Sequence, residues 1–168
     1  MHRTRSLVAL VAFGVAFGYV EAAVVYYLRQ LLGYHQDYAL TGRHVYLDLG
    51  FIAVVAPDRP VLGTGAVTSA EVAREVATIV MLAAVAYLSA RTAGRRLAAF
   101  LVAFAAWDLA YYAFLRVLTG WPTSLNATDV YFLIPVTWVG PVITPLVIFT
   151  LVLVGGSWWY VQGRDGER

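Results

Sequence analysis

Apolar residues gather into four long stretches, at residues 6–32, 69–90, 97–118 and 130–161. A helix that spans a bilayer needs about 20 mostly apolar residues, so each stretch is long enough to cross. The last stretch is longer than a straight span requires and contains Pro135, Pro141 and Pro145. Proline removes a backbone donor and disfavours helix at the residue before it. We therefore predict a fourth helix over residues 141–160, preceded by a separate, broken segment over residues 130–139.

The first stretch follows Arg3 and Arg5, as the apolar core of a secretory signal does. A signal core is about 7–15 residues long and ends at a small-residue cleavage site. Here the apolar character continues past Glu21-Ala22-Ala23 to Leu28. We therefore interpret residues 6–32 as a transmembrane helix.

The connections between the stretches are polar or rich in glycine, proline and tyrosine. The longest covers residues 33–68 and contains an apolar run from Val45 to Ala56. As a helix this run would rise only about 18 Å, short of a hydrocarbon core of about 30 Å. It is an interfacial segment, a re-entrant segment or a short pair of strands. Just after it, Thr68-Ser69-Ala70-Glu71 matches a capping box at the start of the second helix.

Composition supports a membrane protein. Hydrophobic residues make up 61% of the chain and charged residues only 13%, whereas soluble domains carry about 25% charged residues. The chain has no cysteine, which excludes disulfides, thiolate metal sites and cysteine nucleophiles. The predicted fold is an all-α integral membrane protein, with about four transmembrane helices bundled in a single domain over residues 1–168. The loop over residues 33–68 is external and partly ordered.

All twelve basic residues are arginines, in a composition typical of a GC-rich bacterial genome. With four spans, one side of the membrane carries Arg3, Arg5, Arg91, Arg95, Arg96, Arg164 and Arg168. The positive-inside rule places that side in the cytoplasm. We expect a multi-pass protein of the bacterial inner membrane with both termini cytoplasmic. The arginines form no basic stripe or nucleic-acid module, so no nucleic-acid partner is expected.

Charged residues inside the predicted spans are the informative polar positions. Counted from the cytoplasmic helix ends at about 1.5 Å per residue, Asp108, Glu21 and Glu75 lie roughly 16–22 Å up. On the same count Arg74 lies about 24 Å up and Arg116 about 28 Å up. A charge at mid-bilayer costs about 2.5–3.5 kcal/mol, so these groups should face the bundle interior. We predict that the three carboxylates converge with at least one arginine; if all five meet, a proton or cation could neutralise the remaining negative charge.

Neighbouring residues favour this inward orientation. Gly14 and Gly18 form a small-xxx-small pair that lets helices approach closely, and Glu21 follows three residues later. Tyr111 and Tyr112 lie three and four residues after Asp108, so a phenol can reach the region of its carboxylate.

Three functions remain open for this cluster: a site for a proton, cation or small ligand, helix-packing glue in a structural or accessory subunit, and an embedded enzyme. Carboxylates suit hard cations, but the histidines, His2, His35 and His44, all lie outside the spans, so no metal site is predicted. No hydrolase or nucleotide-binding motif is present, and no cofactor is indicated. The expected partners are the lipid bilayer and a protein partner or a second copy of the chain.

The broken backbone over residues 134–141 is a second candidate. Non-helical backbone at membrane depth survives only when it is buried in protein or faces a watery cavity. Trp107, Trp138 and Pro141 are then candidates to line a cavity. The alternatives are a simple kink at the membrane surface and interfacial anchoring by the tryptophans.

Overall fold

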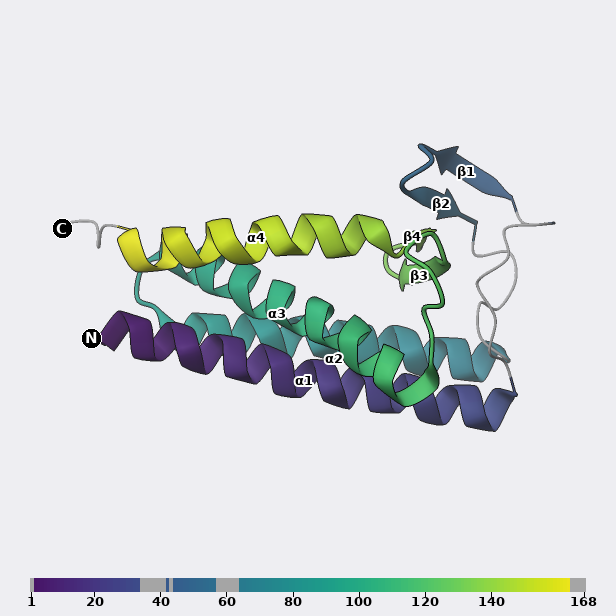
Figure 1. The fold of residues 1–168 in the computed structure, drawn as a ribbon, viewed down its shortest axis with the longest axis horizontal. Coiled ribbons are helices and arrows are strands. Elements are labelled where there is room, and N and C mark those ends of the chain that lie inside the picture. Colours follow the sequence, from purple (N-terminus) through teal and green to yellow (C-terminus); the bar gives the residue numbers. More distant parts are fainter. Residues whose placement is uncertain (1, 34–41, 43, 57–63, 164–168) are drawn as a thin grey trace.

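The computed structural model describes residues 2–33, 42, 44–56 and 64–163. The chain is mostly helical, and four of its helices are long and apolar enough to cross a membrane. They are α1 (His2–Leu32), α2 (Gly65–Ser89), α3 (Ala93–Thr119) and α4 (Ile143–Gln162). Figure 1 shows them side by side in an elongated bundle, with the start of α1 and the end of α4 at the same end of the bundle.

A small antiparallel sheet lies at the other end of the bundle (Figure 1). Its strands are β1 (Val45–Asp48), β2 (Ala53–Val55), β3 (Thr128–Phe132) and β4 (Thr137–Pro141), in the order β1-β2-β4-β3. The expectation of an all-α protein is therefore wrong in this part. The sequence left three interpretations of the apolar run over residues 45–56, and the structure shows the short pair of strands. Residues 130–139 lie in β3, β4 and the turn between them, outside α4.

All four helix starts differ from the sequence prediction, and α1 and α3 begin four residues early, at His2 and Ala93. The starts of α2 and α4 have a local explanation. α2 begins four residues earlier than the capping box implied, because Thr64 is the N-cap and its hydroxyl accepts a hydrogen bond from the Val67 amide at 3.4 Å. α4 begins at Ile143 and includes Pro145 in its first turn. A proline is tolerated there because the first amides of a helix have no partner within the helix.

The closest helix packing is between α1 and α3. A Cβ atom added at Gly14 would meet backbone and Cβ atoms of Ala103, Ala106 and Trp107 at 3.0 Å or less. One added at Gly18 would meet the next turn of α3 in the same way. The glycine pair thus sets the backbones of the two helices against each other, as the small-xxx-small pattern indicates.

If the bundle spans a bilayer, the lengths of its helices locate the sheet relative to that bilayer. The 20 residues of α4 rise about 30 Å, which matches the hydrocarbon core, and β4 ends two residues before α4 begins. The 31 residues of α1 rise about 46 Å, so α1 extends beyond the core. At the termini end the Arg3 guanidinium donates to the carbonyls of Val161 and Gly163, which levels the start of α1 with the end of α4. The excess length of α1 therefore lies at the sheet end.

Candidate functional site

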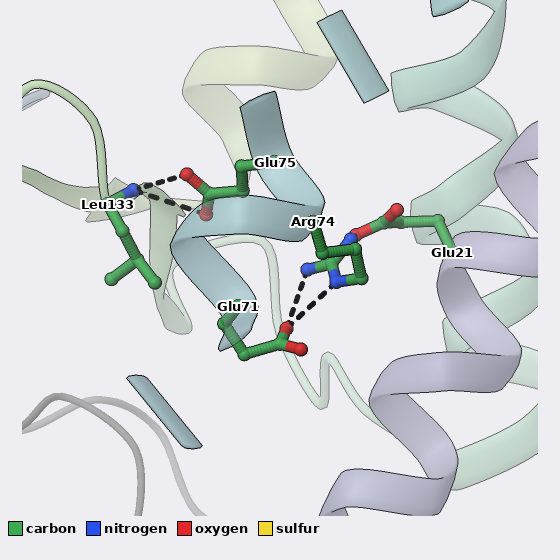
Figure 2. Close-up of polar contacts among 5 residues, drawn as sticks. All are labelled: Glu21, Glu71, Arg74, Glu75 and Leu133. Atoms are coloured by element: carbon green, nitrogen blue, oxygen red, sulfur yellow. Dashed lines mark hydrogen bonds and ion pairs between the residues drawn. The ribbon is translucent and has the colours of Figure 1, made fainter. Parts of the chain in front are cut away.

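The centre of the candidate site is an ion-pair bridge between α1 and α2. The Arg74 guanidinium donates to Glu71 through Nε at 2.9 Å and Nη2 at 2.7 Å, and through Nη1 it pairs with Glu21. Figure 2 shows Arg74 between the two carboxylates, with Glu21 reaching in from α1. Both glutamates are buried, whereas the Arg74 side chain is 24% exposed. The two carboxylates together carry two negative charges, whereas Arg74 carries one positive charge. Glu21, Glu71 and Arg74 are therefore left with one uncompensated negative charge.

Glu71 belongs to this bridge although the sequence analysis did not select it. It lies three residues before Arg74, so the two side chains meet on one face of the helix. The sequence does indicate this pair, because an acidic residue three positions before an arginine in an apolar helix is a candidate ion-pair partner. Glu71 lies closer to the start of α2 than Glu75 does, and so further from the middle of the predicted span.

Glu75, which was expected to converge with Glu21, points to a different partner. Its two carboxylate oxygens accept from the Leu133 amide at 3.2 and 2.9 Å. Figure 2 shows the Glu75 side chain directed away from Arg74, toward the chain between β3 and β4. Glu75 therefore fastens α2 to the sheet. It accepts an amide that the broken backbone would otherwise leave without a partner.

Asp108 is a third buried acidic side chain of the site, and it lies on α3. It is 7% exposed, and its Oδ2 has no hydrogen-bond partner among the described residues. The negative charges of Asp129 and Glu21 act on it. The neighbouring Trp107 is also buried, and its indole Nε1 lacks an acceptor in the described part of the chain. A buried carboxylate without a donor is costly as an anion, so this position calls for a proton or a cationic partner.

The two tyrosines after Asp108 have different roles. Tyr112 donates its hydroxyl to Asp129 Oδ2 at 2.8 Å, and so connects α3 to β3 and not to Asp108. Tyr111 packs edge-on against Tyr112, with 5.0 Å between ring centroids. Electrostatic interactions reach its phenol from Glu21, Asp129, Arg29 and Asp108. Acidic groups from three elements, α1, α3 and β3, therefore act on the Tyr111 phenol.

Arg116 does not join the cluster. It is in the last turn of α3, exposed, and donates to the carbonyl of Gly120, the C-cap residue. A cation at this position satisfies the free carbonyls at the helix end. Of the two arginines that were candidates, Arg74 alone contacts a predicted carboxylate.

The three cavity-lining candidates lie in two packing environments. Trp107 packs against Phe104 and Phe132, with ring centroids 5.3 and 6.3 Å away. Trp138 and Pro141 belong to β4, where Trp138 pairs with Val54 of β2 and Pro141 pairs with Thr128 of β3. These residues build the junction between the bundle and the sheet.

Arg29 is a buried charge that the sequence analysis missed. It is 5% exposed in the last turn of α1, and its guanidinium carbon lies 4.5 Å from the centroid of the Trp121 ring. Cation–π contact and the helix C-terminus both favour a cation here. The signal was its spacing, because Gly18, Ala22 and Arg29 repeat at intervals of four and seven on the α1 face that meets α3.

Apart from the exposed Arg116, the charged groups that pack between the helices and strands at the sheet end are mostly acidic. Five carboxylates gather there, from Glu21, Glu71, Glu75, Asp108 and Asp129, against the two buried or bridging guanidiniums of Arg29 and Arg74. Five negative and two positive groups leave a formal charge of −3 if all are ionised. The described residues contain no group of three histidine, aspartate or glutamate side chains placed to hold a metal ion.

Comparisons with protein-family models, with curated proteins and with solved structures found no match to this chain. What is known of the site therefore comes from its own geometry, namely a buried acidic cluster beneath a small sheet, at one end of a bundle with four helices able to span a membrane.

Proposed function

We propose that this chain is a multi-pass protein of the bacterial inner membrane that binds a proton or a small ammonium-type cation at Asp108. The observation that carries the proposal is the enclosed Oδ2 of Asp108, which has no donor among the described residues. Ionised, it would add to a region that already contains uncompensated negative charge. Binding a proton or a cation relieves that cost, so occupancy of the site is coupled to the stability of the bundle.

The surroundings of Asp108 support a ligand of this chemistry. Its neighbour one turn along, Tyr111, offers an aromatic face and a phenol between several carboxylates. Cations such as alkylammonium groups bind where carboxylates and aromatic rings adjoin. The Arg74 bridge and the Glu75 contact to Leu133 hold the surrounding helices and the sheet in place around this position.

The proposed orientation has both termini in the cytoplasm. Arg3, Arg5 and the arginines of the α2–α3 connection lie at the termini end, which the positive-inside rule assigns to the cytoplasm. Arg29 and Arg116 reduce this asymmetry, because both lie in final helical turns at the sheet end. Arg29 is buried, however, and so contributes less to a loop count than an exposed arginine. In this orientation the candidate site lies in the periplasmic half of the bundle.

Thermal unfolding of the detergent-purified protein tests the ligand. Methylammonium and tetramethylammonium chloride serve as probes, with sodium chloride at equal ionic strength as the reference, and a pH series reports on protons. A ligand at a hundred times its Kd stabilises the folded state by about 2.7 kcal/mol. We expect such stabilisation in the wild type and its loss in Asp108→Asn, which keeps the shape and removes the charge.

Asp48→Asn is the matched control. Asp48 is exposed in β1, outside the helices, and its Oδ1 accepts from the Gly50 amide. This variant should respond to the probes as the wild type does. Equal stabilisation of the wild type and Asp108→Asn by every probe and at every pH would show that Asp108 is not the site.

A second function, a structural or accessory subunit, is favoured by one specific observation. Arg74 is satisfied by two carboxylates from two helices, which is what helix-packing glue requires. In that case Asp108→Asn leaves the protein's behaviour unchanged, and Arg74→Gln separates it from a stoichiometric partner. Native mass spectrometry from mild detergent distinguishes the two functions, because it detects either a bound small cation or a partner protein.

A further inference from the structure

The β1–β2 hairpin exposes apolar side chains where the bundle meets the bilayer surface. The side chains of Leu49 and Phe51, in the turn between the strands, are 52% and 54% exposed. Tyr46 and Leu47 in β1 are exposed as well. The sheet therefore does not cover this hairpin, and its turn presents apolar surface on an element that stands away from the bundle (Figure 1).

The position of the turn is fixed by contacts to the start of α4. The Phe51 carbonyl accepts a hydrogen bond from the Thr144 hydroxyl at 3.0 Å, and Thr144 is the second residue of α4. The Tyr131 hydroxyl also lies 3.5 Å from the Phe51 carbonyl oxygen. The turn itself is closed by a hydrogen bond from the Leu49 amide to the Ile52 carbonyl at 2.9 Å. The turn is thus held at the level of the first turn of α4.

That level coincides with the edge of the hydrocarbon core. α4 has 20 residues and rises about 30 Å, so its first turn reaches one boundary when its last turn reaches the other. In Figure 1 the hairpin turn lies beside the sheet end of α4 and points back along the bundle, toward the membrane-spanning part.

The side of α4 on which the turn sits is the side that faces lipid. Ile148, Leu151 and Trp158 follow Thr144 at intervals of four, seven and fourteen residues, so they continue along the same face of the helix. All three are exposed. The turn is therefore placed above a lipid-exposed stripe, and its apolar side chains extend that stripe beyond the helix.

We propose that the turn of the β1–β2 hairpin, residues 49–52, inserts its apolar side chains into the interfacial region of the bilayer that the bundle spans. The occupant of this surface is lipid. The hairpin then anchors the sheet at the membrane surface, next to the buried acidic cluster. This proposal rests on the membrane assignment and is independent of the ligand at Asp108.

The absence of cysteine from the natural chain allows a clean test. Single-cysteine variants Phe51→Cys and Leu49→Cys carry an environment-sensitive fluorophore and are reconstituted into phosphatidylcholine–phosphatidylglycerol vesicles. Some vesicles contain lipid spin-labelled on the acyl chain next to the headgroup. Leu151→Cys, at an exposed site in the middle of α4, reports lipid contact, and Gly65→Cys reports water. Gly65 is exposed and has no atom within 4 Å of an added Cβ, so the label there is tolerated.

We expect labels at residues 51 and 49 to show emission blue-shifted relative to that at Gly65, and a loss of fluorescence in spin-labelled vesicles greater than that at Gly65. The proposal would be overturned if both hairpin variants showed an emission blue shift and a degree of quenching no greater than those at Gly65. Disulfide-linked dimers of unlabelled Phe51→Cys in oxidised vesicles, together with quenching of the labelled variant at the Gly65 level, would assign the surface to a second copy of the chain and overturn it equally. Ligand binding at Asp108 is measured separately, so either proposal can fail alone.

Discussion

Replacing Gly18 by alanine tests whether the α1–α3 contact is as close as the structure shows. The added Cβ would lie 2.5 Å from the Trp107 carbonyl oxygen, 2.8 Å from the Ala110 Cβ and 2.8 Å from the Tyr111 amide nitrogen. Two of these atoms are backbone, so they cannot move aside by a rotamer change. The helices must separate locally or shift along each other.

The size of the effect follows from two opposing contributions. Overpacking a close contact costs about 1–3 kcal/mol, and rigid backbone neighbours place Gly18 in the upper half of that range. Alanine in place of glycine within a helix returns about 0.8–1.0 kcal/mol. The expected net loss in the free energy of unfolding is about 1–2 kcal/mol, or roughly a 5–30-fold change in the ratio of folded to unfolded protein.

Reversible unfolding in mixed micelles with increasing denaturing detergent measures this difference. Gly155→Ala is the matched control, because Gly155 lies in α4, is exposed, and has nothing within 4 Å of an added Cβ. It should raise stability by up to about 1 kcal/mol through helix propensity alone. The two variants thus have opposite predicted signs. A Gly18→Ala protein as stable as the wild type or more stable would refute the close α1–α3 contact, and with it the placement of Glu21 one turn further along.

Three further predictions concern the bridge, the sheet and the topology. Arg74→Gln leaves Glu21 and Glu71 buried without their cation and should lower the free energy of unfolding by about 3–5 kcal/mol. Adding Glu21→Gln should recover part of that loss. Equal free energies of unfolding for the wild type, the two single variants and the double variant would contradict the bridge. Burial raises the pKa of Tyr131 to about 12, above about 10 in the unfolded chain, so its contribution to stability is present below pH 10 and declines as the pH rises toward 12. Tyr131→Phe should remove that decline from pH-dependent unfolding curves, and an unchanged decline would assign it to other groups. A periplasmic reporter inserted at Ser124, in the exposed α3–β3 connection, should be active, and cytoplasmic activity there would reverse the proposed orientation.

Local sequence pattern predicts the helices of this protein well. Apolar stretches of 20 or more residues have few alternatives to helix, because an unpaired backbone amide in hydrocarbon costs several kcal/mol. Pro135 and Pro141 indicate where the last helix cannot extend, and α4 begins at Ile143. Gly14 and Gly18 indicate the α1 face that packs, because only a face without side chains admits another backbone.

The sheet and the partners of the charges were decided by tertiary structure. β2 pairs with β4, from which it is separated by more than eighty residues and two helices, so no local pattern specifies that register. Arg74 takes Glu71 and Glu21, while Glu75, one residue along, turns to the Leu133 amide. Adjacent residues on a helix point about 100° apart, so equal depth does not bring them together. Sequence shows that a buried charge needs a partner; which partner lies within reach depends on the rotation of each helix, and the packing of the whole bundle sets that rotation.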